Sequence, residues 1–206
     1  MKQRTEEWFE ARLGCVTASM AYLFNNPIPN KTKQNYKFQL IQERLTNSRL
    51  PEKTTKDQFI GREREGDARN YYANQYELVK ECGFIAHPTI KYSGASPDGL
   101  IGNEGLIEIK CPNEKNHDQY LKLEKVPSKY LYQIQFQLAC TQRNWCDFIS
   151  YNPHFPENQK LKVIKVFPDL SLITKLETNI MVFLDEVEQI VEEKKASSKN
   201  LLNNYL

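Results

Sequence analysis

The chain has 206 residues, of which 40% are hydrophobic and 26% are charged, and this composition is typical of an ordinary globular protein with its own core. No apolar run approaches the roughly 20 residues of a membrane-spanning helix, and residues 1–6 lack the apolar core of a signal peptide. A net charge of +2 neither favours nor excludes a nucleic acid as partner, so any basic patch has to be local.

Helices are expected to dominate the first part of the chain. Thr5 is placed to N-cap a short helix that Gly14 closes. A second helix is expected to begin at 17–19 and to end before Pro27. The sequence pattern predicts two further helices, over 33–46 and about 57–76.

Strands and helices alternate in the second part of the chain. Strands are expected over five ranges: 84–87, 92–96, 106–110, 145–151 and 161–167. The polar segment 113–126 is expected to be loop with a short helix, and helices are expected over 128–141 and about 170–195. This order predicts an α/β (α+β) fold, in which a mixed central sheet carries helices on its faces. We expect one domain over 1–206, with the helices of 1–80 packed on the sheet and helices of 81–206.

The cysteines and histidines are scattered along the chain. The five cysteines are odd in number and include no Cys-x-x-Cys pair, so neither a zinc site nor a disulfide framework is expected. Free thiols are typical of a reducing cytosol, and we expect a cytoplasmic protein. His87, His117 and His154 are expected at the surface or in turns.

The most informative stretch combines Asp98, in a Pro-Asp-Gly turn, with Glu108-Ile109-Lys110. The turn enters one strand, and residues 106–110 form the adjacent strand. Because side chains alternate along a strand, Glu108 and Lys110 face the same way, and strand pairing brings Asp98 to the same edge. Two carboxylates suit Mg²⁺, which prefers oxygen ligands, and a lysine beside them can orient the attacking water. The set predicts a metal-dependent phosphodiesterase.

The same residues also have an ordinary structural interpretation. Asp-Gly is common in turns, and Glu-x-Lys on a strand can be a solvated pair. Two details favour the site. Residues 107–110 alternate apolar and charged side chains, so the charged ones share one face of the strand. Cys111-Pro112 then ends the strand, so that Lys110 lies at its rim.

Three weaker patterns accompany this set. Glu65 shares a helix face with small and aromatic residues, which is as consistent with an inward carboxylate as with an exposed salt-bridge ladder. Arg12 and Ser19 flank the Gly14 break and would suit a terminal phosphate, although, taken alone, a helix cap and a surface arginine explain them better. Tyr130, Gln133 and Gln137 share one helix face and can hydrogen-bond to a scissile phosphate or a metal-bound water, although amides on a helix are more often merely exposed.

Together and in chain order, these motifs resemble the lambda exonuclease (YqaJ-type viral recombinase) family, over about residues 5–170. The resemblance is carried by Trp8, Arg12-Leu13-Gly14, Thr17-Ala18-Ser19, Gly61, Glu65, Asp67-Ala68-Arg69, Ser96-Pro97-Asp98-Gly99-Leu100, Glu108-Ile109-Lys110-Cys111-Pro112 and Tyr130 with Gln133-Ile134-Gln135. That family belongs to the restriction-endonuclease-like PD-(D/E)xK superfamily, so the resemblance implies a central mixed sheet flanked by helices.

The resemblance implies a Mg²⁺-dependent 5′→3′ exonuclease, with Mn²⁺ as a possible substitute. It would degrade one strand of linear double-stranded DNA and leave a 3′ overhang for a single-strand annealing protein in phage recombination. Family members form ring-shaped homotrimers, and the location would be the cytoplasm of a bacterial host for a phage or prophage protein. Exposed lysines are candidates to line the channel of such a ring: Lys31, Lys33, Lys37, Lys53 and Lys56.

The resemblance also implies roles for individual residues. Asp98, Glu108 and the carbonyl of Ile109 match the metal ligands, and Lys110 matches the catalytic lysine. The remaining matches are Glu65 and Gln133 in the active site, and Arg12 and Ser19 in the 5′-phosphate pocket.

Two other functions stay open. One is a different nuclease of the same superfamily, such as an endonuclease or a repair nuclease. The other is a non-catalytic DNA-binding protein on the same fold, which would require a broken carboxylate–lysine set, whereas Asp98, Glu108 and Lys110 are all present.

Overall fold

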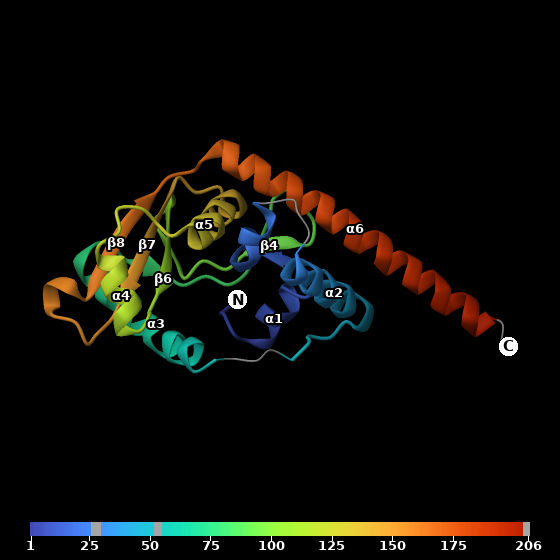
Figure 1. Cartoon of the computed structure of the whole chain (residues 1–206), viewed down its shortest axis with the longest axis horizontal. Helices are drawn as coiled ribbons and strands as arrows, with labels where there is room; N and C mark the ends of the chain where they lie inside the picture. Colours follow the sequence, from blue (N-terminus) through green and yellow to red (C-terminus); the bar gives the residue numbers. More distant parts are fainter. Residues whose placement is uncertain (26–29, 52–54, 204–206) are drawn as a thin grey trace.

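The computed structural model describes residues 1–25, 30–51 and 55–203, whose strands form a five-stranded and a three-stranded sheet (Figure 1). The larger sheet has the order β2-β5-β6-β7-β8, and its one parallel pair is β6 with β7. Its strands are β2 (Val79–Lys80), β5 (Gly99–Ile101), β6 (Gly105–Lys110), β7 (Trp145–Tyr151) and β8 (Leu161–Val166). The smaller sheet consists of β1 (Val16–Thr17), β4 (Ser93–Ala95) and β3 (Ile85–Ala86). Residues 96–98 connect β4 to β5 and therefore join the two sheets.

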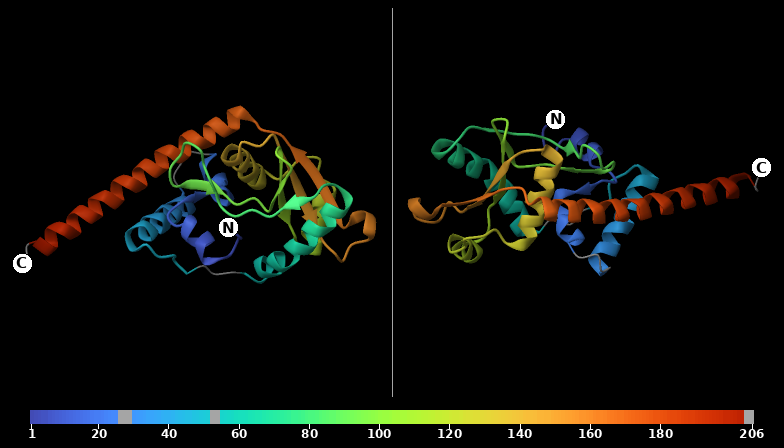
Figure 2. Two further views of the ribbon diagram at one scale, coloured as in Figure 1. Left: turned by 180° about the vertical axis from the view of Figure 1, so that it is seen from behind. Right: turned by 90° about the horizontal axis from the view of Figure 1, so that it is seen from above.

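The helices lie around the two sheets. They are α1 (Glu6–Ala11), the 3₁₀ helix η1 (Ala18–Phe24), α2 (Lys31–Thr46), α3 (Lys56–Gln75), α4 (Glu114–Leu121), α5 (Ser128–Thr141), the 3₁₀ helix η2 (Glu157–Gln159) and α6 (Leu170–Asn203). The long helix α6 runs from the larger sheet along α2, and its C-terminal turns project beyond the body of the molecule (Figures 1 and 2). No helix in the described residues is long and apolar enough to cross a membrane.

Helices α3 and α5 cover opposite faces of the larger sheet. Tyr72 of α3 packs with Ile107 and Ile109 of β6, whereas Ile134 of α5 packs with Leu106. Because side chains alternate along a strand, the even-numbered residues of β6 face α5. The apolar pattern of β6 thus directs Glu108 and Lys110 toward that helix.

A second core joins the N-terminal helices to α5 and α6. Phe183 of α6 meets Phe24 of η1 edge-to-face, with 5.0 Å between the ring centroids, and stacks on Tyr36 of α2 at 6.1 Å. Phe136 of α5 belongs to the same cluster. This core fixes η1 and α2 beside the larger sheet.

Most of the expected elements are present. The helices expected over 33–46, 57–76 and 128–141 and the strands expected over 106–110, 145–151 and 161–167 coincide closely with the observed ones. The mixed central sheet flanked by helices is confirmed. The last helix continues to Asn203 rather than ending near 195, because its charged run is a solvated extension of the helix.

The second expected helix is present as a 3₁₀ helix, which begins at Ala18 and ends at Phe24. Val16 and Thr17 form a strand with β4, and the following turns are a 3₁₀ helix rather than an α-helix. Buried Ala18, Ala21 and Phe24 recur every third residue, which is the period of a 3₁₀ helix. Tertiary packing therefore sets the helix type. Pro27, the expected stop, lies outside the described residues.

The prediction that the Thr5 side chain caps the first helix is wrong. Thr5 occupies the N-cap position of α1 in extended conformation, but its hydroxyl donates to the carbonyl of Lys2 and does not cap the helix. The preceding Arg4 has φ of 66°, a left-handed conformation unusual for a side chain of this size.

The expectation of surface or turn histidines is wrong for His117 and holds only in part for His87, whose ring accepts the N–H of Ile90 in the adjoining turn. His87 is buried, stacks on Phe136 and hydrogen-bonds to Glu177. His117 is fully buried between the Ser150 hydroxyl and a backbone carbonyl. The contacts that bury each ring come from residues far away in the sequence, so the pattern around it gives no sign of burial. His154 is exposed in a turn, as expected.

The candidate channel lysines are not uniformly exposed. Lys33 is half-buried over the rings of Phe24 and Phe183, and Lys37 forms an ion pair with Glu186 of α6. Lys53 lies outside the described residues.

Candidate active site

Asp98 sits where the ladder between β5 and β6 stops. Its backbone N–H donates to the carbonyl of Ile107 at 3.1 Å, and one residue further the strands no longer pair. The Asp98 carboxylate takes over there, since its Oδ2 accepts the N–H of Ile109 at 2.6 Å. A side chain thus continues the ladder and fixes the carboxylate at the end of β6.

Glu108 lies on the α5 face of β6, with only 1% of its surface exposed. Its Oε1 accepts the Gln133 amide at 2.7 Å, and its Oε2 accepts the Gln137 amide at 2.6 Å. Lys110 is two residues further along the same face and forms an ion pair with Glu108. The ammonium of Lys110 also lies 4.8 Å above the ring of Tyr130. The expected common face of Glu108 and Lys110 is confirmed.

Glu65 faces this set from α3. Its carboxylate is 18% exposed and is held by Arg4 at 2.7 Å and by Arg69 at 2.9 Å. Arg69 also donates to the carbonyl of Asp98 at 2.9 Å, so it ties α3 to the turn that carries Asp98. Both interpretations of Glu65 hold in part, because it lines the cavity and still forms a salt bridge along its helix.

The carboxylates repel one another at this site. Burial, together with the charges of Glu108 and Glu65, raises the pKa of Asp98 well above its usual range, against the opposing effect of Lys110. For Lys110, burial favours the neutral amine, but the carboxylates of Glu108 and Asp98 outweigh it and raise the pKa. The carboxylates therefore stabilise the charged form of Lys110, and the ionised form of Asp98 is disfavoured at this site.

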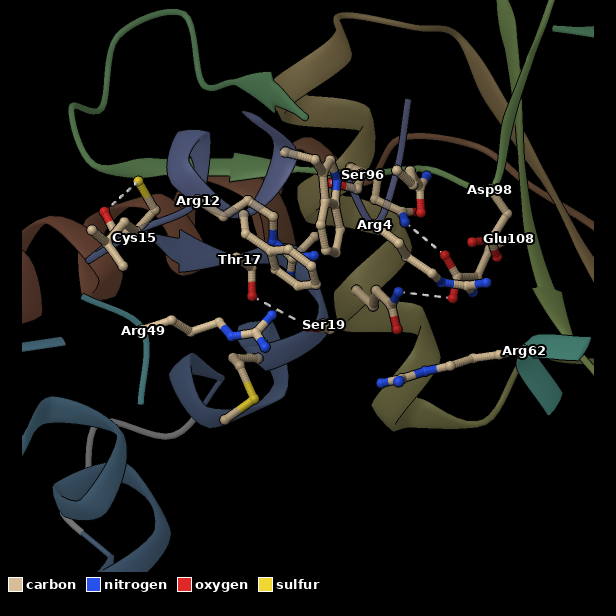
Figure 3. A pocket seen from close by; sticks show the side chains of 18 of the residues that line it. Arg4, Arg12, Cys15, Thr17, Ser19, Arg49, Arg62, Ser96, Asp98 and Glu108 are labelled. Atoms are coloured by element: carbon tan, nitrogen blue, oxygen red, sulfur yellow. Dashed lines mark hydrogen bonds between the residues drawn. The ribbon is translucent and has the colours of Figure 1, made fainter. Parts of the chain in front are cut away.

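A cavity of about 740 Å³ connects these residues to the N-terminal helices. We call Asp98, Glu108 and Lys110 its sheet end, and Arg12, Thr17, Ser19 and Arg49 its helical end. In Figure 3, Asp98 and Glu108 lie across the cavity from the helical end, with Arg4 beside them. The hydroxyls of Thr17 and Ser19 are 3.2 Å apart at the start of η1. The residues expected to act together are thus brought into one cavity.

Trp8 connects the two ends of the cavity. Its ring carries the guanidinium of Arg12 at 3.8 Å from the centroid. Its indole N–H donates to the hydroxyl of Ser96 at 2.9 Å, two residues before Asp98. One aromatic side chain therefore relates Arg12 to the turn that holds Asp98.

Gly14 turns the chain between Arg12 and Ser19, with φ of 65°. Its N–H donates to the buried Glu43 carboxylate at 2.9 Å, and its carbonyl accepts from Arg44 at 3.0 Å. A Cβ at this position would lie 2.5 Å from the Arg44 side chain. The glycine is required both by its conformation and by the close approach of α2.

Sequence reasoning missed part of this site. Arg4, Arg49 and Arg62 also line the cavity, yet nothing in their local pattern distinguishes them from surface arginines. Gln137 lies one helical turn after Gln133 on the helix face expected to reach the phosphate or a metal-bound water, and in the structure it donates to Glu108 as Gln133 does.

The donor set suits a hard cation. In the described residues no three His, Cys, Asp or Glu side chains gather as a metal cage. The expected ligand set is different, because it consists of two carboxylates and the backbone carbonyl of Ile109. A divalent cation between Asp98 and Glu108 would relieve the repulsion that raises the pKa of Asp98, so these residues fit Mg²⁺.

Comparisons with known proteins match most of the chain. The family model of the YqaJ-like viral recombinase domain matches residues 7–144. The crystal structure of an alkaline exonuclease (LHK-Exo) from Laribacter hongkongensis is 41% identical, with a TM-score of 0.88, and the match covers 96% of this chain and 100% of that one. Its complex with dAMP is 42% identical, with a TM-score of 0.87 and the same coverage.

A curated relative is much longer. An uncharacterised protein of Acanthamoeba polyphaga mimivirus is 25% identical over 216 residues, which is 94% of this chain but 38% of that protein. The chain therefore spans well under half the length of that relative.

Proposed function

This chain belongs to the YqaJ-like viral recombinase family, and from that premise we propose that it is a nuclease acting on DNA. More closely, we propose a Mg²⁺-dependent 5′→3′ exonuclease that degrades one strand of linear duplex DNA and leaves a 3′ overhang. The observation that carries the proposal is the shared cavity, in which a buried carboxylate–lysine set faces arginines and hydroxyls suited to a phosphate. The alkaline exonuclease from Laribacter hongkongensis, similar over nearly the whole chain, supports it.

The metal would be held by Asp98, Glu108 and the carbonyl of Ile109, and Mn²⁺ would substitute for Mg²⁺. When bound there, the metal supplies positive charge that stabilises the attacking and leaving oxygens. Gln133 and Gln137 fix the orientation of the Glu108 carboxylate through their amides.

Lys110 has two tasks in this proposal. Its ammonium stays protonated beside Glu108, because the neighbouring carboxylates raise its pKa. It therefore orients the nucleophilic water and offsets the negative charge that develops on the scissile phosphate. Glu65 lines the same cavity, where Arg4 and Arg69 hold it in place.

The helical end would receive the 5′-terminal phosphate. Arg12 offers a planar guanidinium fork, and Ser19 offers a hydroxyl at the start of η1. Recognition of a terminal phosphate at a set separation from the metal site makes the enzyme an exonuclease rather than an endonuclease.

The proposed partners follow from the same activity. They are double-stranded DNA ends, a single-strand annealing protein that receives the overhang, and two further copies of this chain in a homotrimer. The site of action would be the cytoplasm of a bacterial host. Closed cyclic symmetry would keep the DNA enclosed, because a few phosphate contacts alone weaken steeply with salt. Light scattering tests the ring, which has three times the 24.2 kDa mass of the chain.

The activity is tested with linear duplex DNA carrying a 5′-phosphate or a 5′-hydroxyl, and with a closed circular duplex, each with and without Mg²⁺. We expect mononucleotide release from the phosphorylated linear duplex only when Mg²⁺ is present. Cleavage of the closed circle would instead indicate an endonuclease of the same superfamily. Binding without cleavage of any substrate would indicate a non-catalytic DNA-binding protein.

A further inference from the structure

A second arginine lines the helical end of the cavity. Arg49 comes from the segment between α2 and α3, and its guanidinium lies 3.9 Å above the centroid of the Phe9 ring. Figure 3 shows this side chain extending toward Ser19, on the same side of the cavity as Arg12 and Thr17. In the described part of the chain Arg49 forms no ion pair with a carboxylate.

The two arginines rest on one aromatic pair. Trp8 and Phe9 are consecutive in α1, and their rings meet edge-to-face with centroids 4.9 Å apart. Arg12 lies over the first ring and Arg49 over the second, at nearly equal distances. A stacked guanidinium is weakly hydrated and keeps its N–H donors at the ring's periphery, so it is prepared to bind a planar set of oxygens.

The carboxylates that line the cavity are occupied by other groups. Glu43 accepts the N–H of Gly14 and the amide of Gln39. Glu65 is held by Arg4 and Arg69 on the side of the sheet end. The helical end therefore presents positive charge and hydroxyl donors toward the cavity.

We propose that Arg49 is the second cation of the terminal-phosphate pocket and gives the enzyme its selectivity for a phosphomonoester. This inference rests on the proposed function. A terminal phosphate carries a charge of about −1.5 to −2 at pH 7, whereas an internal phosphodiester carries one negative charge. One guanidinium matches the diester, and a second one favours the additional charge of the monoester.

The test compares Arg49→Ala with wild type on linear duplexes that bear a 5′-phosphate or a 5′-hydroxyl. We expect the ratio of kcat/KM for the two ends to fall about ten- to a hundredfold, as for the loss of one charge-assisted hydrogen bond. The rate on the 5′-hydroxyl end should change less than about twofold, because that substrate lacks the group that Arg49 binds. Arg49→Lys should restore only part of the ratio, since an ammonium lacks the planar fork.

Arg64→Ala is the matched control. Arg64 lies on α3, contacts the His154 ring and does not line the cavity. The same arginine-to-alanine change there should leave the ratio at its wild-type value. A wild-type ratio in Arg49→Ala, or a parallel loss on both substrates, would overturn the proposal.

Calorimetry with dAMP and deoxyadenosine separates this proposal from the proposed function. The wild-type chain should bind dAMP more tightly than the nucleoside, and Arg49→Ala should remove most of that difference. If wild type cuts no DNA but Arg49→Ala still removes the phosphate preference, the proposed function fails and the phosphate pocket stands. If Arg49→Ala binds dAMP as wild type does, the role of Arg49 is refuted, whether or not the chain cuts DNA.

Discussion

The two ends of the cavity are built in opposite ways. At the sheet end, strand alternation and one ladder position fix Glu108, Lys110 and Asp98, and buried amides from α5 hold the central carboxylate. At the helical end, Arg12 and Arg49 come from separate segments and depend on stacking over aromatic rings. The first arrangement is set by regular backbone pairing and the second by side-chain packing between distant residues. We therefore expect mutations at the sheet end to abolish chemistry and mutations at the helical end to change substrate preference.

The largest expected effect is that of Glu108→Gln. The substitution keeps the shape of the side chain but removes the charge proposed to hold the metal, so kcat/KM should fall about 10²–10⁴-fold on both kinds of DNA end. Nuclease assays measure the loss, and circular dichroism should show an unchanged fold. The control is Glu104→Gln, at an exposed position one residue before β6. Near wild-type cleavage by Glu108→Gln would refute the assignment of the sheet end.

Arg12→Ala has the next largest expected effect and should distinguish the role of the helical end from that of the sheet end. Loss of this charge-assisted contact costs about 1.5–3 kcal/mol, which is roughly a ten- to a hundredfold loss of preference for 5′-phosphorylated ends. Turnover on 5′-hydroxyl ends should stay close to wild type. Competition between the two duplexes in one reaction measures the ratio directly. An unchanged ratio would show that the helical end does not read the phosphate.

Asp98→Asn should make the metal-free protein more stable. The pKa of the Asp98 carboxyl is raised in the native state, so its contribution to stability is complete below the unfolded pKa and is lost as pH rises through the native pKa. Above the ordinary Asp range, burying this carboxyl costs free energy that Asn removes, and Tm should rise by about 2–4 °C for each kcal/mol gained.

Thermal unfolding in EDTA and in Mg²⁺ checks this prediction. Mg²⁺ should raise the Tm of wild type and have little effect on Asp98→Asn, because binding to the native state alone stabilises it. In EDTA the Tm of wild type should decline as pH rises above the ordinary Asp range, and the mutant should lack this decline. Equal shifts with Mg²⁺ in both proteins would remove Asp98 from the proposed ligand set.

The smallest expected effect is that of Phe9→Leu. Leucine keeps apolar volume but removes the ring face under Arg49, and a cation–π contact of about 0.5–1 kcal/mol corresponds to a two- to fivefold loss of 5′-phosphate preference. The same competition assay measures this change. A loss as large as that of Arg49→Ala would mean that the ring alone positions the arginine. No loss would mean that the stacking is incidental.

The difference between the two ends also explains what the sequence can predict. Glu108 and Lys110 follow from the two-residue period of a strand, and Asp98 follows from a recognisable turn. Arg49, Arg4 and the buried partners of His117 depend on contacts across the chain, which no local pattern encodes. The 3₁₀ geometry of η1 is intermediate between these two cases. The three-residue spacing of Ala18, Ala21 and Phe24 is visible in the sequence once that period is sought. The single domain over 1–206 stays a prediction.

The hydrogen bond from the Trp8 indole to the Ser96 hydroxyl has a consequence for the length of the fragments released. It helps to set the gap between the helical end of the cavity, which is proposed to bind the end of a strand, and the sheet end, which is proposed to cut that strand. Under the proposed function, the length of each fragment is fixed by this gap and not by the base sequence. If the cut leaves the phosphate on the remaining strand, every cycle creates the 5′-phosphate from which the length of the next fragment is set. Trp8→Phe removes this hydrogen bond, so it should give fragments of mixed length rather than slower cutting.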